Sequence, residues 1–343
     1  MPVSAAVGVR GLTRRFGAHT AVDGLTFDVP AGTLFGLVGP DGAGKTTTLR
    51  MLAGVLRPTA GEISVGGVNV VKDPEGSKHH VAYMPQRFGL YDDLTVRENL
   101  DFYADLYQVP KTDRAARLER LYRFSSLGPF AARLAGQLSG GMKQKLALSC
   151  ALVHQPEILL LDEPTFGVDP ISRRDLWLIL HDMVAAGVTV VVSTAYMDEA
   201  ERCDTVALLE RGRVVALDPP EALQRGLPVR MEAVRTADPR RAAALLAAAP
   251  GVRRAALFGD VVHVSLEGGD GGFGPAGAAL AGAGIAVLDH HEIVPSLEDV
   301  FIERTAGTGA QGHRGTGEAG TGAQAHGGTG EAGTGAQAHG GTG

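Results

Sequence analysis

A glycine-rich run at residues 39–46 has the residue types and the spacing of a phosphate-binding loop. It reads Gly-Pro-Asp-Gly-Ala-Gly-Lys-Thr, which matches the pattern G-x-x-x-x-G-K-[ST]. Glycines allow backbone N–H groups to turn toward phosphate oxygens, and a helix that begins at Lys45 would add its positive N-terminal dipole. The Lys45 ammonium would contact β- and γ-phosphates, and the Thr46 hydroxyl would bind Mg²⁺. A plain turn is the alternative in a chain with 48 glycines, but the flanking strand and helix patterns favour the phosphate loop.

Two adjacent carboxylates, Asp162 and Glu163, follow the apolar run at residues 158–161. Ligands of open α/β sheets bind at the carboxyl ends of the strands, where this run would deliver both side chains. Asp162 would hold Mg²⁺ through water, and Glu163 would orient or deprotonate an attacking water. A strand that ends in a polar turn explains the Asp-Glu-Pro sequence alone, but not its occurrence together with a phosphate loop.

A third segment, Leu138-Ser-Gly-Gly-Met-Lys-Gln144, leads into a helical pattern. Apolar residues recur there at helical spacing, and they are Met142, Leu146, Cys150 and Val153. Ser139 is a favourable N-cap, so the segment can be interpreted as an ordinary helix-starting turn. The amide-rich start of this helix could also hold a phosphate. From these residues alone, both interpretations stay open.

The elements that would position these segments alternate between short apolar strands and helical patterns up to about Gly226. This alternation indicates an α/β layer architecture. The predicted strands are nearly all apolar, as expected for strands that helices cover on both faces; they span residues 33–38, 158–161 and 188–192. We therefore expect a first domain at residues 1–226.

The pattern changes near Leu227 and Pro228. The residues that follow predict the order β-α-β-β-α-β, which is typical of a small ferredoxin-like α+β domain. The predicted strands span residues 229–235, 252–258, 261–266 and 285–289, and the predicted helices span residues 240–249 and 275–283. We expect this second domain to cover residues 227–305.

Residues 306–343 contain no Val, Ile, Leu or aromatic side chain, and the unit GTGEAGTGAQAHG occurs in them twice. Such a segment cannot bury enough apolar surface to offset the entropy lost on ordering, so we expect a disordered tail. His313, His326 and His339 recur within it, but the repeat explains their spacing without weak metal binding.

Composition argues against several other classes of protein. The chain has 32 basic and 38 acidic side chains and a formal net charge of −6, so it lacks the overall basic footprint of a nucleic-acid-binding protein. Cys150 and Cys203 form neither a disulfide framework nor a metal-ligand spacing, and we expect both to be packed thiols in a reducing interior. The sequence shows no signal-peptide pattern, and no run approaches the ~18 apolar residues of a membrane span. Any transport pathway would belong to another polypeptide.

Taken in order along the chain, these motifs resemble those of the ATP-binding-cassette (ABC) family. The phosphate loop would be Walker A, and Asp162 with Glu163 would be Walker B and its glutamate. Tyr83-Met-Pro-Gln86 resembles the Q-loop, residues 138–141 the LSGG signature, and Phe166-Gly-Val-Asp169-Pro the D-loop. Five motifs in this order over about 130 residues are far more specific than any one of them.

The resemblance implies a P-loop NTPase fold with a RecA-like core, an antiparallel β subdomain and a helical subdomain. It also implies ATP and Mg²⁺ as cofactors, Glu163, Gln86 and Lys45 as catalytic residues, and Thr46, Gln86 and Asp162 as the metal-binding set. Phe16 takes the place of the aromatic that stacks on adenine, although a lone aromatic is more often packing. Asp41 stands where asparagine is common, and we expect it to point away from the phosphates. The implied nucleotide contacts are Phe16, Gly39, Pro40, Asp41, Gly42, Ala43, Gly44, Lys45, Thr46, Thr47, Gln86, Ser139, Gly140, Gly141, Asp162 and Asp169.

In this family two cassettes pair head to tail, and the signature of one subunit completes the nucleotide site of the other. The resemblance therefore implies a homodimer, or pairing with a related cassette, in which Ser139 and Gly141 face the γ-phosphate held by the opposite subunit. Residues 85–99 and 196–201 resemble the branch that exports drugs, sodium or lipid-linked compounds. Residues 295–301 resemble the C-terminal end of daunorubicin-type export ATPases.

These features predict an ATP-hydrolysing exporter subunit that is cytoplasmic and peripheral on the inner face of the cell membrane. Its partner would be a separate integral membrane permease, reached through residues 86–139, although residues 94–106 could equally be an ordinary surface helix. A cassette protein of translation or DNA repair would carry two cassettes, coiled-coil insertions or basic surfaces, which the sequence does not show. A soluble or regulatory ABC protein that binds ATP with little or no hydrolysis stays open as the alternative.

The sequence departs from the family pattern after the strand at residues 188–192. Where the family has a histidine that contacts the γ-phosphate, this chain has Ala195 in the run Ser-Thr-Ala-Tyr. Loss of one charge-stabilising donor can slow a reaction by ~100-fold or more, so the rate of hydrolysis is open. The retained Lys45, Asp162 and Glu163 favour hydrolysis over a site that only clamps ATP.

Overall fold

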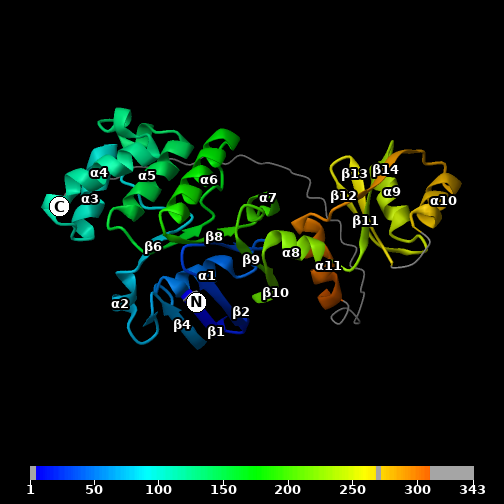
Figure 1. Cartoon of the computed structure of the whole chain (residues 1–343), viewed down its shortest axis with the longest axis horizontal. Helices are drawn as coiled ribbons and strands as arrows, with labels where there is room; N and C mark the ends of the chain where they lie inside the picture. The colour runs from blue at the N-terminus through cyan, green and yellow to red at the C-terminus, as the bar shows by residue number, and fades with distance from the viewer. Residues whose placement is uncertain (1–4, 268–271, 310–343) are drawn as a thin grey trace, which may run out of the picture.

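The computed structural model describes residues 5–267 and 272–309, which form three β-sheets with helices packed against them (Figure 1). The expected tail at residues 310–343 lies outside these ranges. Within the described ranges, the structure has no helix with the length and apolar character needed to cross a membrane.

Six strands form the central sheet of the first domain. They are β3 (Leu34–Val38), β6 (Val81–Met84), β7 (Ile158–Asp162), β8 (Thr189–Thr194), β9 (Thr205–Glu210) and β10 (Arg213–Asp218). Their order across the sheet is β10-β9-β3-β8-β7-β6, and all neighbours pair in parallel except β10 and β9. Every residue of β3, β7 and β8 is buried, as the apolar runs within them predict.

Helices cover both faces of the central sheet. Successive side chains of β3 point to opposite faces: Leu34 shares a buried cluster with Trp177 of α6 (Pro170–Ala185), and Phe35 shares another with Leu49 of α1 (Lys45–Leu52). Three short helices complete this part, namely α2 (Pro74–Lys78), α7 (Met197–Ala200) and α8 (Pro220–Arg225).

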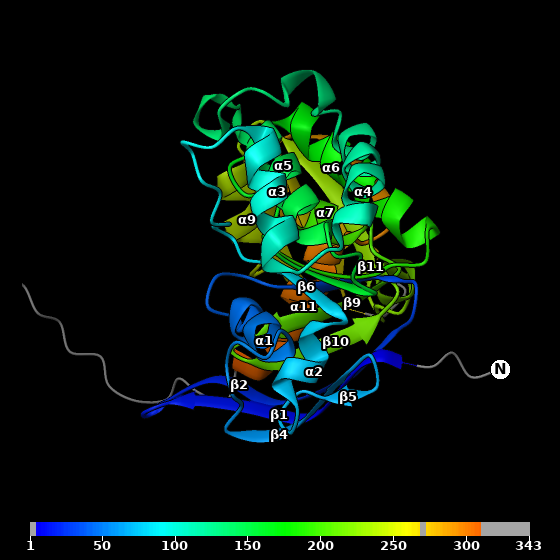
Figure 2. The same cartoon turned by 90° about the vertical axis from the view of Figure 1, so that its left-hand side faces the viewer.

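A smaller antiparallel sheet covers the α1 side of the first domain. Its strands are β1 (Ala5–Phe16), β2 (His19–Pro30), β4 (Ala60–Val65) and β5 (Val68–Asn69), in the order β2-β1-β4-β5. Figure 2 shows this sheet at the bottom, α1 and α2 above it, and the central sheet above them. Buried residues of β1 and β2, such as Val9 and Phe27, join the same core cluster as Leu49.

A helical part lies on the other side of the central sheet (Figure 2). It contains α3 (Val96–Leu106), α4 (Lys111–Ser125), the 3₁₀ turns at Gly128–Phe130 and Ala135–Gln137, and α5 (Gly140–Leu152). Leu146, Cys150 and Val153 are buried in its own core cluster, so the predicted apolar side of α5 is confirmed. Both cysteines are buried free thiols, and burial raises the pKa of Cys203 to about 12.

The second domain has the element order that the sequence predicts. The elements are β11 (Arg230–Thr236), α9 (Pro239–Leu246), β12 (Val252–Phe258), β13 (Val261–Leu266), α10 (Gly274–Gly282) and β14 (Val287–Ile293). The antiparallel sheet has the order β12-β13-β11-β14. β14 ends four residues beyond the predicted end at Asp289. The sequence did not indicate this continuation, because an exposed edge strand can be polar and no apolar run marks it.

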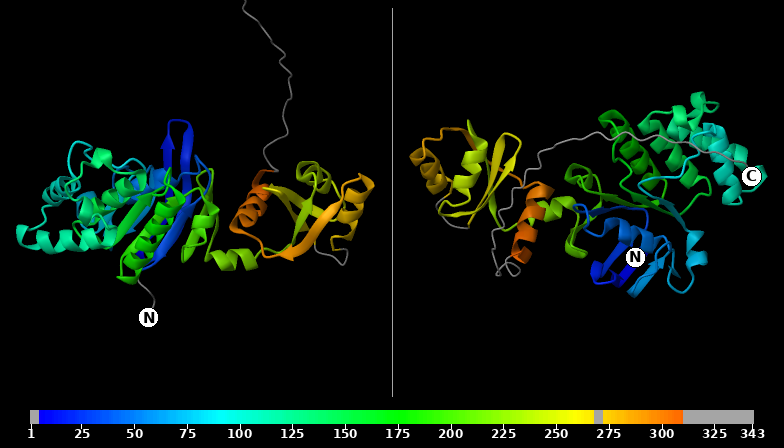
Figure 3. Two further views of the ribbon diagram at one scale, coloured as in Figure 1. Left: turned by 90° about the horizontal axis from the view of Figure 1, so that it is seen from above. Right: turned by 180° about the vertical axis from the view of Figure 1, so that it is seen from behind.

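The last helix, α11 (Leu297–Gly309), returns to the first domain. Leu297 and Val300 are buried in the cluster that contains Leu223 and Leu227, so α11 lies beside α8 (Figures 1 and 3). The expected division at residue 227 had assigned this helix to the second domain. α11 also extends four residues into the segment expected to be disordered, because helical hydrogen bonds do not require apolar side chains.

Candidate nucleotide-binding site

The glycine-rich loop connects β3 to α1 at the carboxyl end of the central strands. Gly44 has a φ of 100°, in a region that side-chain-bearing residues avoid. A Cβ on Gly39 would lie 2.3 Å from the carbonyl oxygen of Leu209 in β9. The Gly39 N–H also donates to the carbonyl oxygen of Thr194 in β8, at 3.2 Å. The loop is therefore held against two neighbouring strands.

The Lys45 side chain folds back into the loop and is only 4% exposed. Its Nζ donates to the carbonyl oxygens of Gly39 (2.8 Å) and Pro40 (3.2 Å). The same ammonium forms an ion pair with Glu163 Oε1 at 3.1 Å. The structure therefore brings the loop lysine and the glutamate after β7 together, although 118 positions separate them in the sequence.

Asp162 is buried at the carboxyl end of β7 and accepts three side-chain hydrogen bonds. Thr46 Oγ1 (2.9 Å) and Ser193 Oγ (2.7 Å) donate to Oδ1, and the Tyr83 hydroxyl donates to Oδ2 at 3.4 Å. Burial, with the charge of Asp162 as the next cause, raises the pKa of Tyr83 to about 12, so the phenol stays a donor. The hydroxyl of Thr46 and the carboxylate of Asp162 are the hard oxygen ligands that Mg²⁺ prefers.

Glu163 has an unusual backbone conformation, with a φ of 49°. A non-glycine residue in the left-handed region costs about 1–3 kcal/mol and persists only where its surroundings hold it. The Glu163 N–H donates to both the hydroxyl (3.0 Å) and the carbonyl oxygen (3.2 Å) of Ser193. Its Oε2 accepts from Gln86 Nε2 at 3.1 Å. Gln86 and Lys45 therefore orient the carboxylate, while β8 holds the backbone of Glu163.

The signature residues and the D-loop aspartate form a second group. Ser139 is the N-cap of α5, where its Oγ accepts from the Met142 N–H at 3.3 Å. Asp169 is the N-cap of α6 and accepts from the N–H groups of residues 171 and 172, and these bonds lower its pKa. A Cβ on Gly141 would lie 2.2 Å from Ser172 Oγ, so glycine allows α5 and α6 to approach here.

The remaining predicted contacts lie at the surface or within the loop. Phe16 at the end of β1 is 46% exposed, and the Arg14 guanidinium carbon lies 4.4 Å from its ring centroid. Asp41 is exposed. Of the others, Pro40, Gly42 and Gly140 are exposed, Thr47 is half-buried and Ala43 is buried.

Ser193 and Tyr83 are two site residues to which the sequence analysis gave no role. Ser193 aligns with Asp162 in the β7–β8 pairing, and its side chain is fully buried against both carboxylate residues. Tyr83 lies on β6, three residues before Gln86 and next to β7. The available signal was a polar residue, Ser193, directly after the apolar residues 190–192 of a buried strand, since buried polar groups require partners.

Comparison with known proteins agrees with this geometry. Residues 22–166 match the family described as ABC transporter. The Nod factor export ATP-binding protein I of Burkholderia lata is 43% identical over 224 residues, which cover 65% of this chain and 73% of the relative. The chain belongs to the ABC transporter family. The corresponding protein of Burkholderia thailandensis is 35% identical over 303 residues, 88% of this chain and 97% of that protein.

The ABC protein also resembles a longer relative and solved cassettes. It is 52% identical over 222 residues to the probable multidrug ABC transporter ATP-binding protein YbhF of Escherichia coli, but it spans only 38% of that relative's length. A solved ATP-binding subunit of an ABC transporter is 32% identical, with a TM-score of 0.59 over 64% of this chain and 92% of the other. The dimeric cassette MJ0796 bound to ADP and Pi is 25% identical, with a TM-score of 0.57 over 62% of this chain and 98% of the other.

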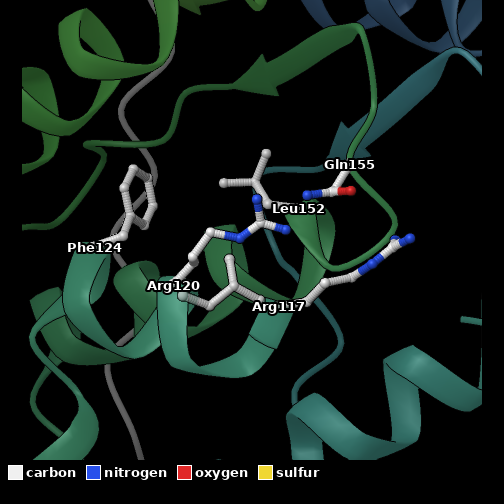
Figure 4. Close-up of a pocket in the computed structure, with 6 residues that line it drawn as sticks. Arg117, Arg120, Phe124, Leu152 and Gln155 are labelled. Atoms are coloured by element: carbon white, nitrogen blue, oxygen red, sulfur yellow. The ribbon is translucent and has the colours of Figure 1, made fainter. Parts of the chain in front are cut away.

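The ABC protein has a hollow of about 200 Å³ away from the phosphate loop, between α4 and the end of α5 (Figure 4). One side of the hollow is lined by α4, with Arg117, Arg120 and Phe124, and the other side is lined by Leu152 and Gln155. These residues are outside the predicted nucleotide contacts. The hollow therefore belongs to the helical part rather than to the nucleotide site.

Proposed function

We propose that this chain binds ATP with Mg²⁺ and hydrolyses it as the energy-coupling subunit of an exporter whose permease is a separate membrane protein. The observation that carries the proposal is the contact of Lys45 and Gln86 with the two carboxylate oxygens of Glu163. Positioning and electrostatic stabilisation account for most of the catalysis of phosphoryl transfer. The Lys45 ammonium and the Gln86 amide therefore both contact the Glu163 carboxylate.

The loop N–H groups and Lys45 would bind the phosphates of ATP, with the start of α1 contributing its dipole. Mg²⁺ would be held by Thr46, by Asp162 through water and by Gln86, and it would neutralise charge on the β- and γ-phosphates. The bond between Thr46 Oγ1 and Asp162 Oδ1 supports this assignment, since it puts two oxygen ligands within 2.9 Å. Phe16 would stack on adenine once the Arg14 guanidinium moves from its ring.

Glu163 would act as the general base that orients or deprotonates the attacking water. A general base has to lie within hydrogen-bond reach of its substrate, and its pKa and orientation decide its effect. The left-handed φ of Glu163 and the two bonds from its N–H to Ser193 fix the direction of the side chain. Such strain at a carboxylate supports a catalytic role more than a structural one.

Two copies would share the ATP sites. In one chain the residues form two groups, with Lys45 and Glu163 in one, and Ser139, Gly141 and Asp169 in the other. Head-to-tail pairing would place the signature group of one copy opposite the phosphate loop of the other. The solved MJ0796 cassette is dimeric, which supports the same arrangement here.

The permease would dock on the helical part, as we infer from its exposed aromatic surface. Phe102 and Leu106 on α3, and Tyr107 after it, are between 37% and 58% exposed. A hollow of about 730 Å³ lies beside Tyr107 and His154, whose rings stack with centroids 4.1 Å apart. Exposed apolar patches of this kind mark protein–protein contacts. The relatives named for multidrug transport and Nod factor export support export as the direction.

The proposal is tested by steady-state hydrolysis of ATP by the complex with its permease. We expect Glu163→Gln to lower kcat by about 100-fold or more, because a general base is lost. Binding of Mg²⁺ and ATP should persist, since the loop and Asp162 are unchanged. Glu298→Gln, on the exposed side of α11, serves as the control and should match the wild type. Equal rates for wild type and Glu163→Gln would show that Glu163 is not the base.

The second candidate function is a cassette that binds ATP and regulates a partner with little turnover. Ala195 favours it, because an exposed methyl group stands where a γ-phosphate donor is expected. We expect Ala195→His to raise the rate of ATP hydrolysis, and Ala195→Leu, which adds size without a donor, to leave it unchanged. A rate that stays near zero in both wild type and Ala195→His would favour the regulatory function.

A further inference from the structure

A cluster of polar side chains lies directly behind the turn that carries Ala195. It consists of Arg173 on α6, Tyr196 in the turn and Glu199 on α7, and we call it the Arg173 cluster. The Arg173 guanidinium carbon lies 4.6 Å from the Tyr196 ring centroid. The Arg173 Nε lies 3.5 Å from Glu199 Oε1. One guanidinium thus contacts both the turn and the helix that follows it.

Glu199 needs this cation because its side chain is only 1% exposed. Its Oε2 accepts a hydrogen bond of 2.7 Å from Thr194 Oγ1. Its Oε1 and Arg173 Nε are both buried and, among the described residues, make no hydrogen bond of good geometry, so their interaction is an ion pair rather than a hydrogen bond. A buried carboxylate without a cation is strongly unfavourable, and Arg173 is the cation that lies beside Glu199.

The cluster connects α6 with the phosphate loop through the end of β8. Thr194 Oγ1 accepts from the Tyr196 N–H at 3.0 Å, and the Thr194 carbonyl accepts from the Gly39 N–H at 3.2 Å. At the start of α6, the backbone N–H of Arg173 donates to the carbonyl oxygen of Asp169 at 2.9 Å. A continuous path of contacts therefore runs from the D-loop aspartate to the first glycine of the loop.

We propose that Arg173 is a positioning residue for ATP hydrolysis, acting through Glu199 and Thr194 on the backbone of the phosphate loop. The inference rests on the proposed ATPase function and adds a residue outside the motifs. With Ala195 lacking a side-chain donor, the position of the reacting phosphate would depend on the loop N–H groups and Lys45, and the end of β8 supports this loop through the bond from the Gly39 N–H to the Thr194 carbonyl oxygen. Small displacements of such groups slow the chemical step while leaving most of the binding contacts intact.

The test compares kcat with nucleotide affinity in the full chain bound to its permease. Arg173→Ala should lower kcat by about tenfold or more, while the Kd for a non-hydrolysable ATP analogue changes by less than about twofold because the loop contacts remain. The kcat of Arg173→Lys should lie between those of the wild type and Arg173→Ala. Lysine keeps the charge beside Glu199 but cannot stack on Tyr196 as a planar group. The exposed neighbour Arg174→Ala should behave as the wild type.

Several results would overturn the proposal. Wild-type kcat in Arg173→Ala, together with a loss of activity in Glu163→Gln, would exclude the positioning role and leave the proposed ATPase function standing. A loss of nucleotide affinity equal to the loss of kcat would show an ordinary structural role. If Arg173→Ala does not fold, Tyr196→Leu decides, and an unchanged kcat in it would contradict the proposal. Absence of ATP hydrolysis by the wild-type complex would instead remove the ATPase function, and the positioning role with it.

Discussion

At the scale of single residues, one hydroxyl group contacts both Asp162 and Glu163. Ser193 Oγ donates to Asp162 Oδ1 and accepts from the Glu163 N–H. These two bonds use the donor and one acceptor position of the hydroxyl, and the residue is fully buried. The backbone of the proposed general base, Glu163, and the orientation of the proposed Mg²⁺ ligand, Asp162, therefore depend on the same side chain.

We expect Ser193→Ala to lower kcat by about 10-fold to 100-fold, as is usual for partners that orient metal ligands. Affinity for Mg²⁺ and ATP should fall as well, because Asp162 loses its shortest hydrogen bond. Steady-state hydrolysis and nucleotide binding measure both effects. Ser125→Ala is a matched control, since Ser125 is a buried serine that donates to Leu121 O within α4. A Ser193→Ala protein as active as this control would contradict the assigned role.

The residues of the site differ in how far they could be predicted. Lys45, Thr46 and Asp162 could be predicted as site residues, because short local sequence patterns contain them. Ser193 was not identified, because its role arises from the pairing of β7 with β8, which aligns it with Asp162. The left-handed φ of Glu163 could not be predicted from the sequence either, because a glutamate does not indicate a positive φ as a glycine can.

At the scale of elements, the strands that carry the site were the most predictable. β3, β7 and β8 each contain a run of apolar residues, and such runs identify strands that are buried on both faces. β1 and β2 are 12 residues long and mix polar with apolar positions, and their pairing has several register shifts. Their antiparallel sheet was therefore implied by family resemblance rather than by pattern.

The helix α11 depends on a buried carboxylate at its start. Asp299 accepts from the Ser296 N–H (2.8 Å) and hydroxyl (2.7 Å), and it lies 3.0 Å from His263 Nδ1 on β13. Ser296 Oγ in turn accepts from the Asp299 N–H at 3.2 Å. This reciprocal pair is a capping box. It fixes α11 against the second domain while Leu297 and Val300 pack in the first.

We expect Asp299→Ala to lower the free energy of unfolding by about 1–3 kcal/mol, because buried donors lose their acceptor. Thermal and urea unfolding measure the change. The exposed neighbour Glu298→Ala should cost much less. Equal losses in the two variants would mean that the buried contacts of Asp299 contribute little, and that α11 is held by its apolar side alone.

At the scale of the whole molecule, the last helix changes the expected division of the chain. The sequence pattern changes at residues 227 and 228, but α11 brings Leu297 and Val300 back into the core beside Leu223 and Leu227. No local pattern could show this, because the contact joins residues about 75 positions apart through the fold. Truncation at Gly226 would therefore expose apolar surface of the first domain.

The arrangement of the site within one chain has a further consequence for assembly. Lys45, Gln86 and Glu163 converge through direct contacts, whereas Ser139 and Gly141 lie with α6 and Asp169. The proposed function requires the two groups to meet across a dimer interface. A contact in which each copy supplies both groups to the other is isologous and closes into a two-fold dimer. ATP hydrolysis should then depend on residues of two different chains.

The most direct measurement of this claim is the ATPase activity of mixed variants. Lys45→Ala should disable the phosphate loop in both sites of its homodimer, and Ser139→Ala should disable the signature in both sites of its own. A mixed dimer would hold one site with a wild-type loop and a wild-type signature, so an equal mixture should regain about a quarter of wild-type activity if pairing is random. Activity no greater than the sum of the two variants measured separately would contradict shared sites.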